Sequence, residues 1–116
     1  MGCGIAEVLL RSGMAVQWVD RSAELVEAGV VRLRASVDRA VSRGKLESSA
    51  CLSLLDTSSL EVSEADLVIE AVVEDMAVKK ELLAPLSARF PQALLASNTS
   101  SLSLTEMAAA CERPER

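Results

Sequence analysis

The sequence predicts an α/β protein built on a doubly wound parallel sheet, and three observations support this. Apolar segments with strand-like composition alternate with segments of helical periodicity. The run 67–73 is continuous and rich in β-branched residues, which is typical of a strand buried on both faces. A second apolar strand, 93–96, leads into the Ser, Asn and Thr side chains of 97–101. Ligands of such sheets bind beyond the carboxyl ends of strands, so this cluster indicates a polar ligand.

The N-terminal part is expected to hold a helix followed by a short strand. Residues 4–12 place apolar side chains on one face of a helix, and Gly13 is suited to its C-cap. The strand covers 15–19, and Asp20 closes it.

A long helix follows, which Ser22 caps and Gly44 ends. Residues 47–55 form a weaker helix or turn region, and the cluster 57–59 is expected to end a short strand. Apolar residues of the long helix recur at spacings of three and four: Leu25, Val26, Val30, Leu33, Val37, Ala40 and Val41.

The C-terminal part repeats the alternation of strand and helix. After the strand 67–73, a helix is expected over 77–90, where Pro85 should kink or split it because proline lacks an N–H group. The strand 93–96 and a last helix, 103–110, complete the pattern.

Composition narrows the class of protein. The length of 116 residues suits one domain, 1–116, and 12 basic against 17 acidic residues give a net charge of −5. There is no basic stripe, and Trp18 and Phe90 are the aromatic residues, which argues against a nucleic-acid partner. No apolar run approaches the roughly 20 residues that span a bilayer, so no membrane association is expected.

The cysteines carry no metal or disulfide pattern. Cys3, Cys51 and Cys111 are odd in number, far apart and outside any C-x-x-C motif. We expect no metal site, and a reducing, cytoplasmic location.

The start of the chain resembles part of a dinucleotide-binding βαβ unit. Gly2 is either the third glycine of that fingerprint or an ordinary glycine near a terminus. Asp20, at the end of the next strand, is placed to accept hydrogen bonds from an adenosine ribose, which favours NAD. Arg21 beside it leaves an opening for NADP, and a plain helix-start role is the alternative for Asp20.

Charged residues follow the strand 67–73. Glu74 is placed to meet a ligand at the carboxyl end, whereas Glu70 lies inside the apolar run and needs a structural partner. Lys79 in the next helix can reach the same ligand; the alternative for Lys79 and Lys80 is a solvated helix face.

Together these segments resemble the NAD-binding domain of the 3-hydroxyacyl-CoA dehydrogenase family, a Rossmann-like domain, over nearly the whole chain. The residues that carry the resemblance are Met-Gly-Cys-Gly-Ile-Ala at 1–6, Asp-Leu-Val-Ile-Glu-Ala-Val-Val-Glu at 66–74, and Lys79. Ala-Ser-Asn-Thr-Ser-Ser at 96–101 and Pro-Glu-Arg at 114–116 are also similar to the family's sequences.

The resemblance implies an enzyme that oxidises 3-hydroxyacyl-CoA to 3-ketoacyl-CoA with NAD, in fatty-acid β-oxidation or a related CoA pathway. Gly2, Asp20, Glu74 and Lys79 would bind the cofactor. Ser100 would lie near the nicotinamide and hydrogen-bond the reacting oxygen of the substrate, as its catalytic, substrate-positioning residue.

The same resemblance implies a substrate site. Ser36 and Arg43 on the long helix would contact the CoA moiety, and Asn98 would face the substrate. The family's full-length members are expected to be homodimers.

The chain has no histidine, whereas the family's proton acceptor is a histidine held by a glutamate. We therefore expect a fragment truncated at both ends, lacking the first strand and the C-terminal helical domain. Alone it should be inactive, and either marginally stable or self-associating. Two alternatives are another Rossmann-fold nucleotide-binding protein, such as one for S-adenosylmethionine, and a non-catalytic structural domain.

Overall fold

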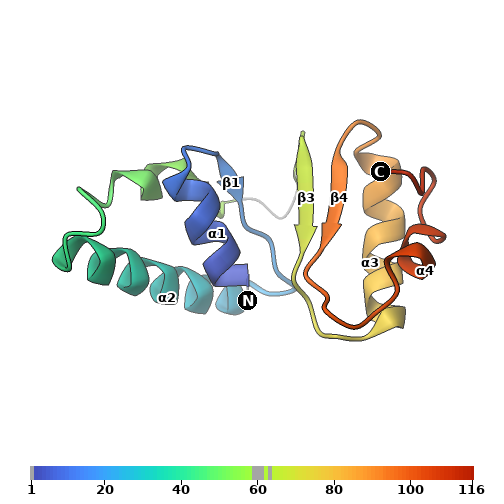
Figure 1. Cartoon of the computed structure of the whole chain (residues 1–116), viewed down its shortest axis with the longest axis horizontal. Coiled ribbons are helices and arrows are strands. Elements are labelled where there is room, and N and C mark those ends of the chain that lie inside the picture. The colour runs from blue at the N-terminus through green and yellow to red at the C-terminus, as the bar shows by residue number, and fades with distance from the viewer. Residues whose placement is uncertain (1, 59–61, 63) are drawn as a thin grey trace. The chain divides into compact units, whose positions relative to one another are not determined.

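A computed structural model describes residues 2–58, 62 and 64–116 of the chain. They fall into two compact units, 1–62 and 63–116, and each is described by itself (Figure 1). Both units pair parallel strands and pack helices against them, which confirms the predicted α/β class. The described strands form two separate two-stranded sheets. That 1–116 form a single domain stays a prediction.

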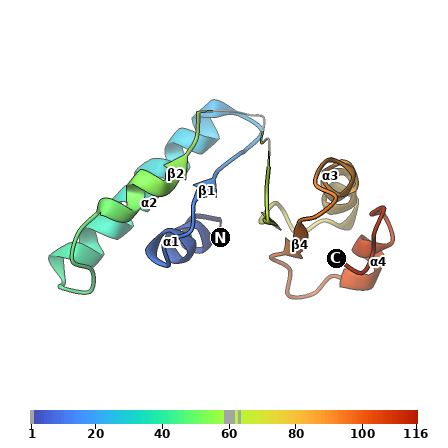
Figure 2. The same ribbon diagram turned by 90° about the horizontal axis from the view of Figure 1, so that it is seen from above.

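The first unit is organised around two helices, α1 (Gly2–Arg11) and α2 (Ala23–Ser42). Strand β1 (Val16–Gln17) pairs in parallel with β2 (Leu55–Asp56), which follows a 3-10 helix over Ala50–Leu54. Helix α1 packs against α2 and β1 (Figures 1 and 2). The buried core between them consists of Ala6, Leu10, Leu33 and Val37.

Capping residues mark the termini of these helices at the positions that the sequence predicts. The Ser22 hydroxyl accepts the N–H of Leu25 at 3.3 Å and so caps α2. Gly13 and Gly44 adopt φ angles of 80° and 67°, the left-handed conformation that terminates a helix at low cost in glycine. Strand β2 ends directly before the predicted 57–59 strand end, of which Ser59 lies outside the described residues.

The second unit contains the parallel pair β3 (Leu67–Glu70) and β4 (Leu94–Ser97), in which Glu70 lies opposite Ser97. Helix α3 (Met76–Arg89) connects the strands, and α4 (Leu104–Ala108) packs against α3 (Figure 2). Among the described residues, no helix is long and apolar enough to cross a membrane.

Arg116 holds the C-terminal segment onto this unit. Its guanidinium donates hydrogen bonds to the carbonyls of Phe90 and Ala93 at 3.0 and 2.7 Å, and its own carbonyl accepts the N–H of Leu95 at 2.9 Å. The turn between α3 and β4 is therefore fixed by a residue more than 20 positions away.

Three predicted details are wrong. The strand predicted over 67–73 ends at Glu70, because the Glu70 carboxylate accepts the N–H of Val72 at 3.2 Å and removes that donor from the ladder. Leu67 is 39% exposed, so the strand is not buried on both faces. Helix α3 continues through Pro85, so the predicted split is wrong, while a kink at Pro85 stays a prediction.

Candidate functional site

The carboxyl end of β3 carries a buried ion pair. Glu70 is 3% exposed, and the ammonium of Lys79, from the first turns of α3, lies 2.7 and 2.8 Å from its two carboxylate oxygens. The Ser97 hydroxyl, at the end of β4, also donates to Glu70. The structural partner predicted for Glu70 is therefore confirmed, and it is Lys79.

Glu74 lies at the surface beside this pair. Its side chain is 41% exposed, and one carboxylate oxygen lies 3.5 Å from the Lys79 ammonium. The hydroxyls of Thr99 and Ser101 donate to its other oxygen, the latter at 3.1 Å. The Thr99 hydrogen bond lowers the pKa of Glu74 below its usual value, and the weaker contributions of Ser101 and the Lys79 charge act in the same direction.

The segment after β4 presents Ser100 to solvent between two anchored neighbours. Ser100 is exposed, whereas Thr99 and Ser101 are held by Glu74. The N–H of Asn98 donates to the Glu70 carbonyl at 2.9 Å. The predicted residues Glu74, Asn98 and Ser100 thus lie on one polar edge of this unit.

The solvated helix face considered for Lys79 is wrong, because its side chain is completely buried. Lys80 does lie at the surface, where its ammonium pairs with Glu106 at 2.6 Å. A role for Lys79 toward the cofactor stays a prediction, and its burial favours an indirect role through Glu74.

Asp20 lies in the first unit, beyond the carboxyl end of β1, with an exposed side chain. One carboxylate oxygen accepts the N–H of Arg21 at 2.8 Å. Because Ser22 caps α2, the helix-start role considered for Asp20 is wrong. Gly2 is the first residue of α1, while Met1 of the glycine motif lies outside the described residues.

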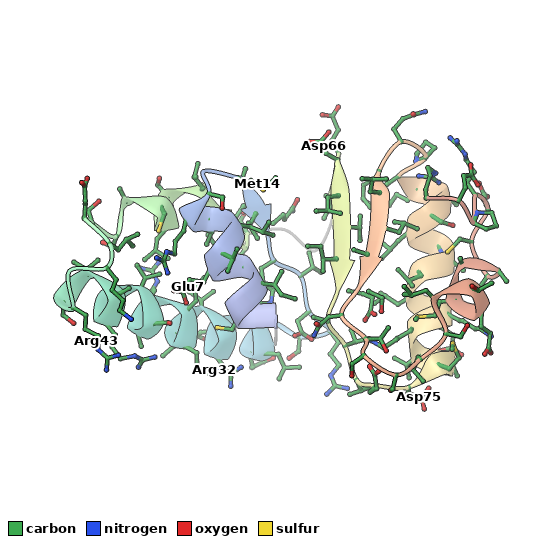
Figure 3. All side chains as sticks on the ribbon, viewed as in Figure 1. Glu7, Met14, Arg32, Arg43, Asp66 and Asp75 are labelled. Carbon is green, nitrogen blue, oxygen red and sulfur yellow. The ribbon has the colours of Figure 1, made fainter. Side chains whose placement is uncertain are left out.

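A groove of about 320 Å³ runs between α1 and α2, and Ser36 lines it. Arg32 and Arg39 line the same groove, and the exposed Arg43 lies at the end of α2. Figure 3 shows Arg32 and Arg43 projecting from the same edge of α2. Arg32 and Arg39 were not predicted, although their spacing of four and three residues from Ser36 places all three on one helical face.

Each unit, taken by itself, exposes groups whose chemistry suits part of a dinucleotide such as NAD. The Asp20 carboxylate has acceptor capacity for ribose hydroxyls, and Ser100 offers a hydroxyl that donates and accepts. The Lys79 ammonium does not fit a direct contact, because it is buried and faces two carboxylates. Among the described residues, no cluster of three His, Cys, Asp or Glu side chains could hold a metal ion.

Parallel strands linked by helices, with polar side chains beyond the carboxyl ends of the strands, are typical of nucleotide-binding α/β domains. Residues 1–116 match the family model described as "3-hydroxyacyl-CoA dehydrogenase, NAD binding domain". The chain belongs to this family, so the predicted family and the predicted cofactor, NAD, are confirmed.

Known relatives match the chain over its whole length. It is 46% identical to the 3-hydroxybutyryl-CoA dehydrogenase of Mycobacterium tuberculosis and 42% identical to the 3-hydroxyadipyl-CoA dehydrogenase of Escherichia coli, covering 43% and 26% of these proteins. The crystal structure of M. tuberculosis FadB2 superposes on all of the chain with a TM-score of 0.92 at 44% identity. The Rossmann-like fold is thereby confirmed. The chain spans less than half the length of these relatives.

Proposed function

We propose that the chain is the NAD-binding part of an NAD-dependent 3-hydroxyacyl-CoA dehydrogenase of fatty-acid β-oxidation or a related CoA pathway. The observation that carries this proposal is the family match over residues 1–116. Such an enzyme oxidises a 3-hydroxyacyl-CoA to a 3-ketoacyl-CoA, and bound NAD would supply the hydride acceptor.

The polar edge of the second unit would hold the nicotinamide end of the cofactor and the reacting part of the substrate. Ser100 would hydrogen-bond the substrate oxygen, since its hydroxyl is exposed while both neighbours are anchored. Asn98 would contact the substrate, and Glu74 would bind the cofactor. The chain has no histidine, so we propose that the proton acceptor is supplied by sequence outside these 116 residues.

The first unit would bind the adenosine parts of both ligands. Asp20 would accept hydrogen bonds from the NAD ribose, and Gly2 would lie near its pyrophosphate at the start of α1. Ser36 and Arg43 would contact CoA. The groove adds Arg32 and Arg39, whose guanidinium groups suit the phosphates of CoA.

Cofactor binding tests the first part of this proposal. Titration of the chain with NADH, followed by nicotinamide fluorescence, should give a saturable signal that Asp20→Ala removes. Asp38→Ala, at an exposed aspartate on α2, is the matched control and should bind NADH as the wild type does. A folded chain with no affinity for NADH would favour the non-catalytic alternative.

Substrate binding tests the groove. Arg39→Ala should weaken the binding of CoA by about tenfold, because one charged hydrogen bond to phosphate is lost. Arg34→Ala, at an exposed arginine of α2 outside the groove lining, should leave CoA affinity unchanged. Equal losses in the two variants would indicate attraction by overall charge instead of a site.

We further propose a cytoplasmic location and a homodimeric full-length enzyme. The odd number and wide spacing of the three cysteines support a reducing compartment. Size-exclusion chromatography of the full-length protein tests the dimer.

A further inference from the structure

The side chain and backbone of Glu70 make polar contacts with four other residues. Its two carboxylate oxygens accept hydrogen bonds from the Lys79 ammonium, the Ser97 hydroxyl and the N–H of Val72. Its backbone carbonyl accepts the N–H of Asn98 at 2.9 Å. One residue therefore joins the end of β3, the start of α3 and the end of β4.

A second layer of contacts extends from Glu70 to the surface. Lys79 lies 3.5 Å from Glu74, and Glu74 holds the hydroxyls of Thr99 and Ser101. The Thr99 oxygen in turn accepts the N–H groups of Ser101 and Leu102 at 3.4 and 3.1 Å. These contacts restrain the segment 98–102, which includes the exposed residue Ser100.

Stability alone is a poor explanation for this arrangement. Burying two charges costs solvation energy, and replacing a buried ion pair with apolar residues of similar size is often neutral or stabilising. A well-satisfied buried network does, however, restrict its members to one geometry. The Glu70 and Lys79 side chains are 1% and 0% exposed, so neither is placed to contact a ligand itself.

We propose that Glu70 is a positioning residue for the cofactor and substrate site. By holding Lys79 and Ser97, it fixes the Glu74 carboxylate and the segment 98–102 in the geometry that binding requires. This inference rests on the proposed function, because it assumes that NAD meets Glu74 and Ser100.

The test compares Glu70→Gln with Glu81→Gln, a matched change at an exposed glutamate of α3. An amide has one acceptor oxygen, so Gln at position 70 cannot satisfy the donors that now meet two oxygens. Glu70→Gln should weaken NADH binding about 10- to 100-fold, the scale expected for a small misplacement of binding groups. Amide hydrogen exchange at Ser101 and Leu102 should accelerate in the same variant. Glu81→Gln should change neither quantity.

A spectroscopic signature separates positioning from plain support of the fold. Without the Glu70 charge, Lys79 interacts with Glu74 alone, so the pKa of Glu74 should fall further. An NMR titration of the Glu74 carboxyl carbon measures this. The double variant Glu70→Leu with Lys79→Met guards against unfolding, since it replaces the pair with apolar residues. It should remain folded and bind NADH as weakly as Glu70→Gln.

Wild-type NADH affinity in a folded Glu70→Gln or double variant, with unchanged exchange at Ser101 and Leu102, would overturn the proposal. If the wild-type chain itself binds no NADH, the proposed function fails for this chain. The exchange and titration measurements then decide the positioning role of Glu70 by themselves.

Discussion

The two units contain similar elements but differ in what their interiors hold. In 1–62 the buried cluster is apolar and joins α1 to α2, while the arginines of α2 lie at the surface. In 63–116 the buried side chains include the Glu70–Lys79 ion pair and Ser87. The comparison indicates that charged groups outside an apolar core stay free for ligands, whereas a buried ion pair fixes the groups around it.

The largest expected effect comes from breaking the buried pair. Lys79→Met leaves Glu70 as an unpaired buried carboxylate and should lower the free energy of unfolding by about 3–5 kcal/mol. Urea denaturation measures the loss, and amide exchange at Glu70 and Ser97 locates it in the second unit.

The adjacent Lys80→Met is the control. Lys80 pairs with Glu106 at 2.6 Å, but both side chains are partly exposed, so the loss should stay below about 1 kcal/mol. Equal losses for the two lysines would mean that burial of the Lys79 pair has no energetic consequence.

In the first unit, the corresponding substitution removes an apolar side chain from the buried core. Leu33 is fully buried, and Leu33→Ala should cost about 2–5 kcal/mol through lost burial and the cavity left behind. Its control is Val31→Ala on the same helix, where the side chain is 61% exposed and the expected loss is under about 0.5 kcal/mol. Thermal unfolding followed by circular dichroism compares the two. A loss for Val31→Ala as large as that for Leu33→Ala would contradict the apolar core described for this unit.

The contrast also explains which features the sequence could reveal. The bounds of α2 were predictable because Ser22 and Gly44 act locally, through a cap and a left-handed turn. The burial of Lys79 was not predictable, since its partner Glu70 lies nine residues away on another element. The end of β3 at Glu70 escaped prediction for a similar reason, because a side chain takes the N–H of Val72.

The candidate site likewise has features that the sequence could reveal and features that it could not. Glu74, Asn98 and Ser100 were predicted from their place after apolar strands and from the family resemblance. The hydrogen bonds of Glu74 with Thr99 and Ser101 span 25 and 27 residues, so only the folded chain could reveal them. The sequence could have predicted Arg32 and Arg39, because their helical spacing from Ser36 places all three residues on one face of the helix.

A smaller effect concerns the close packing of Trp18, the residue after β1, against Gly29 of α2. A methyl group at Gly29 would lie 2.6 Å from the Trp18 ring, so Gly29→Ala requires the ring or the helix to move. Overpacking of this kind costs about 1–3 kcal/mol, which exceeds the roughly 1 kcal/mol that alanine gains over glycine in a helix. Thermal unfolding should therefore show a net loss of stability for Gly29→Ala.

Gly4→Ala makes the same change in α1, where nothing lies within 4 Å of the added carbon. It should raise the free energy of unfolding by up to about 1 kcal/mol, because helix propensity acts without a clash. The two variants should thus shift the melting temperature in opposite directions. A rise in melting temperature for both variants would show that the Trp18 ring moves at little energetic cost.

The smallest effect is the pH dependence contributed by Glu74 at the surface of the second unit. Its pKa in the folded chain lies below the usual value of 4.5, mainly because Thr99 donates to the carboxylate. A lowered folded pKa means that the stabilisation is complete above 4.5 and is lost as the pH falls through the folded pKa. The difference in unfolding free energy between the wild type and Glu74→Gln should therefore be constant near neutral pH and shrink on acidification. Urea denaturation at a series of pH values measures it, with Glu81→Gln as the exposed control. A difference that grows as the pH falls would mean that protonated, not ionised, Glu74 is the form that Thr99 and Ser101 stabilise.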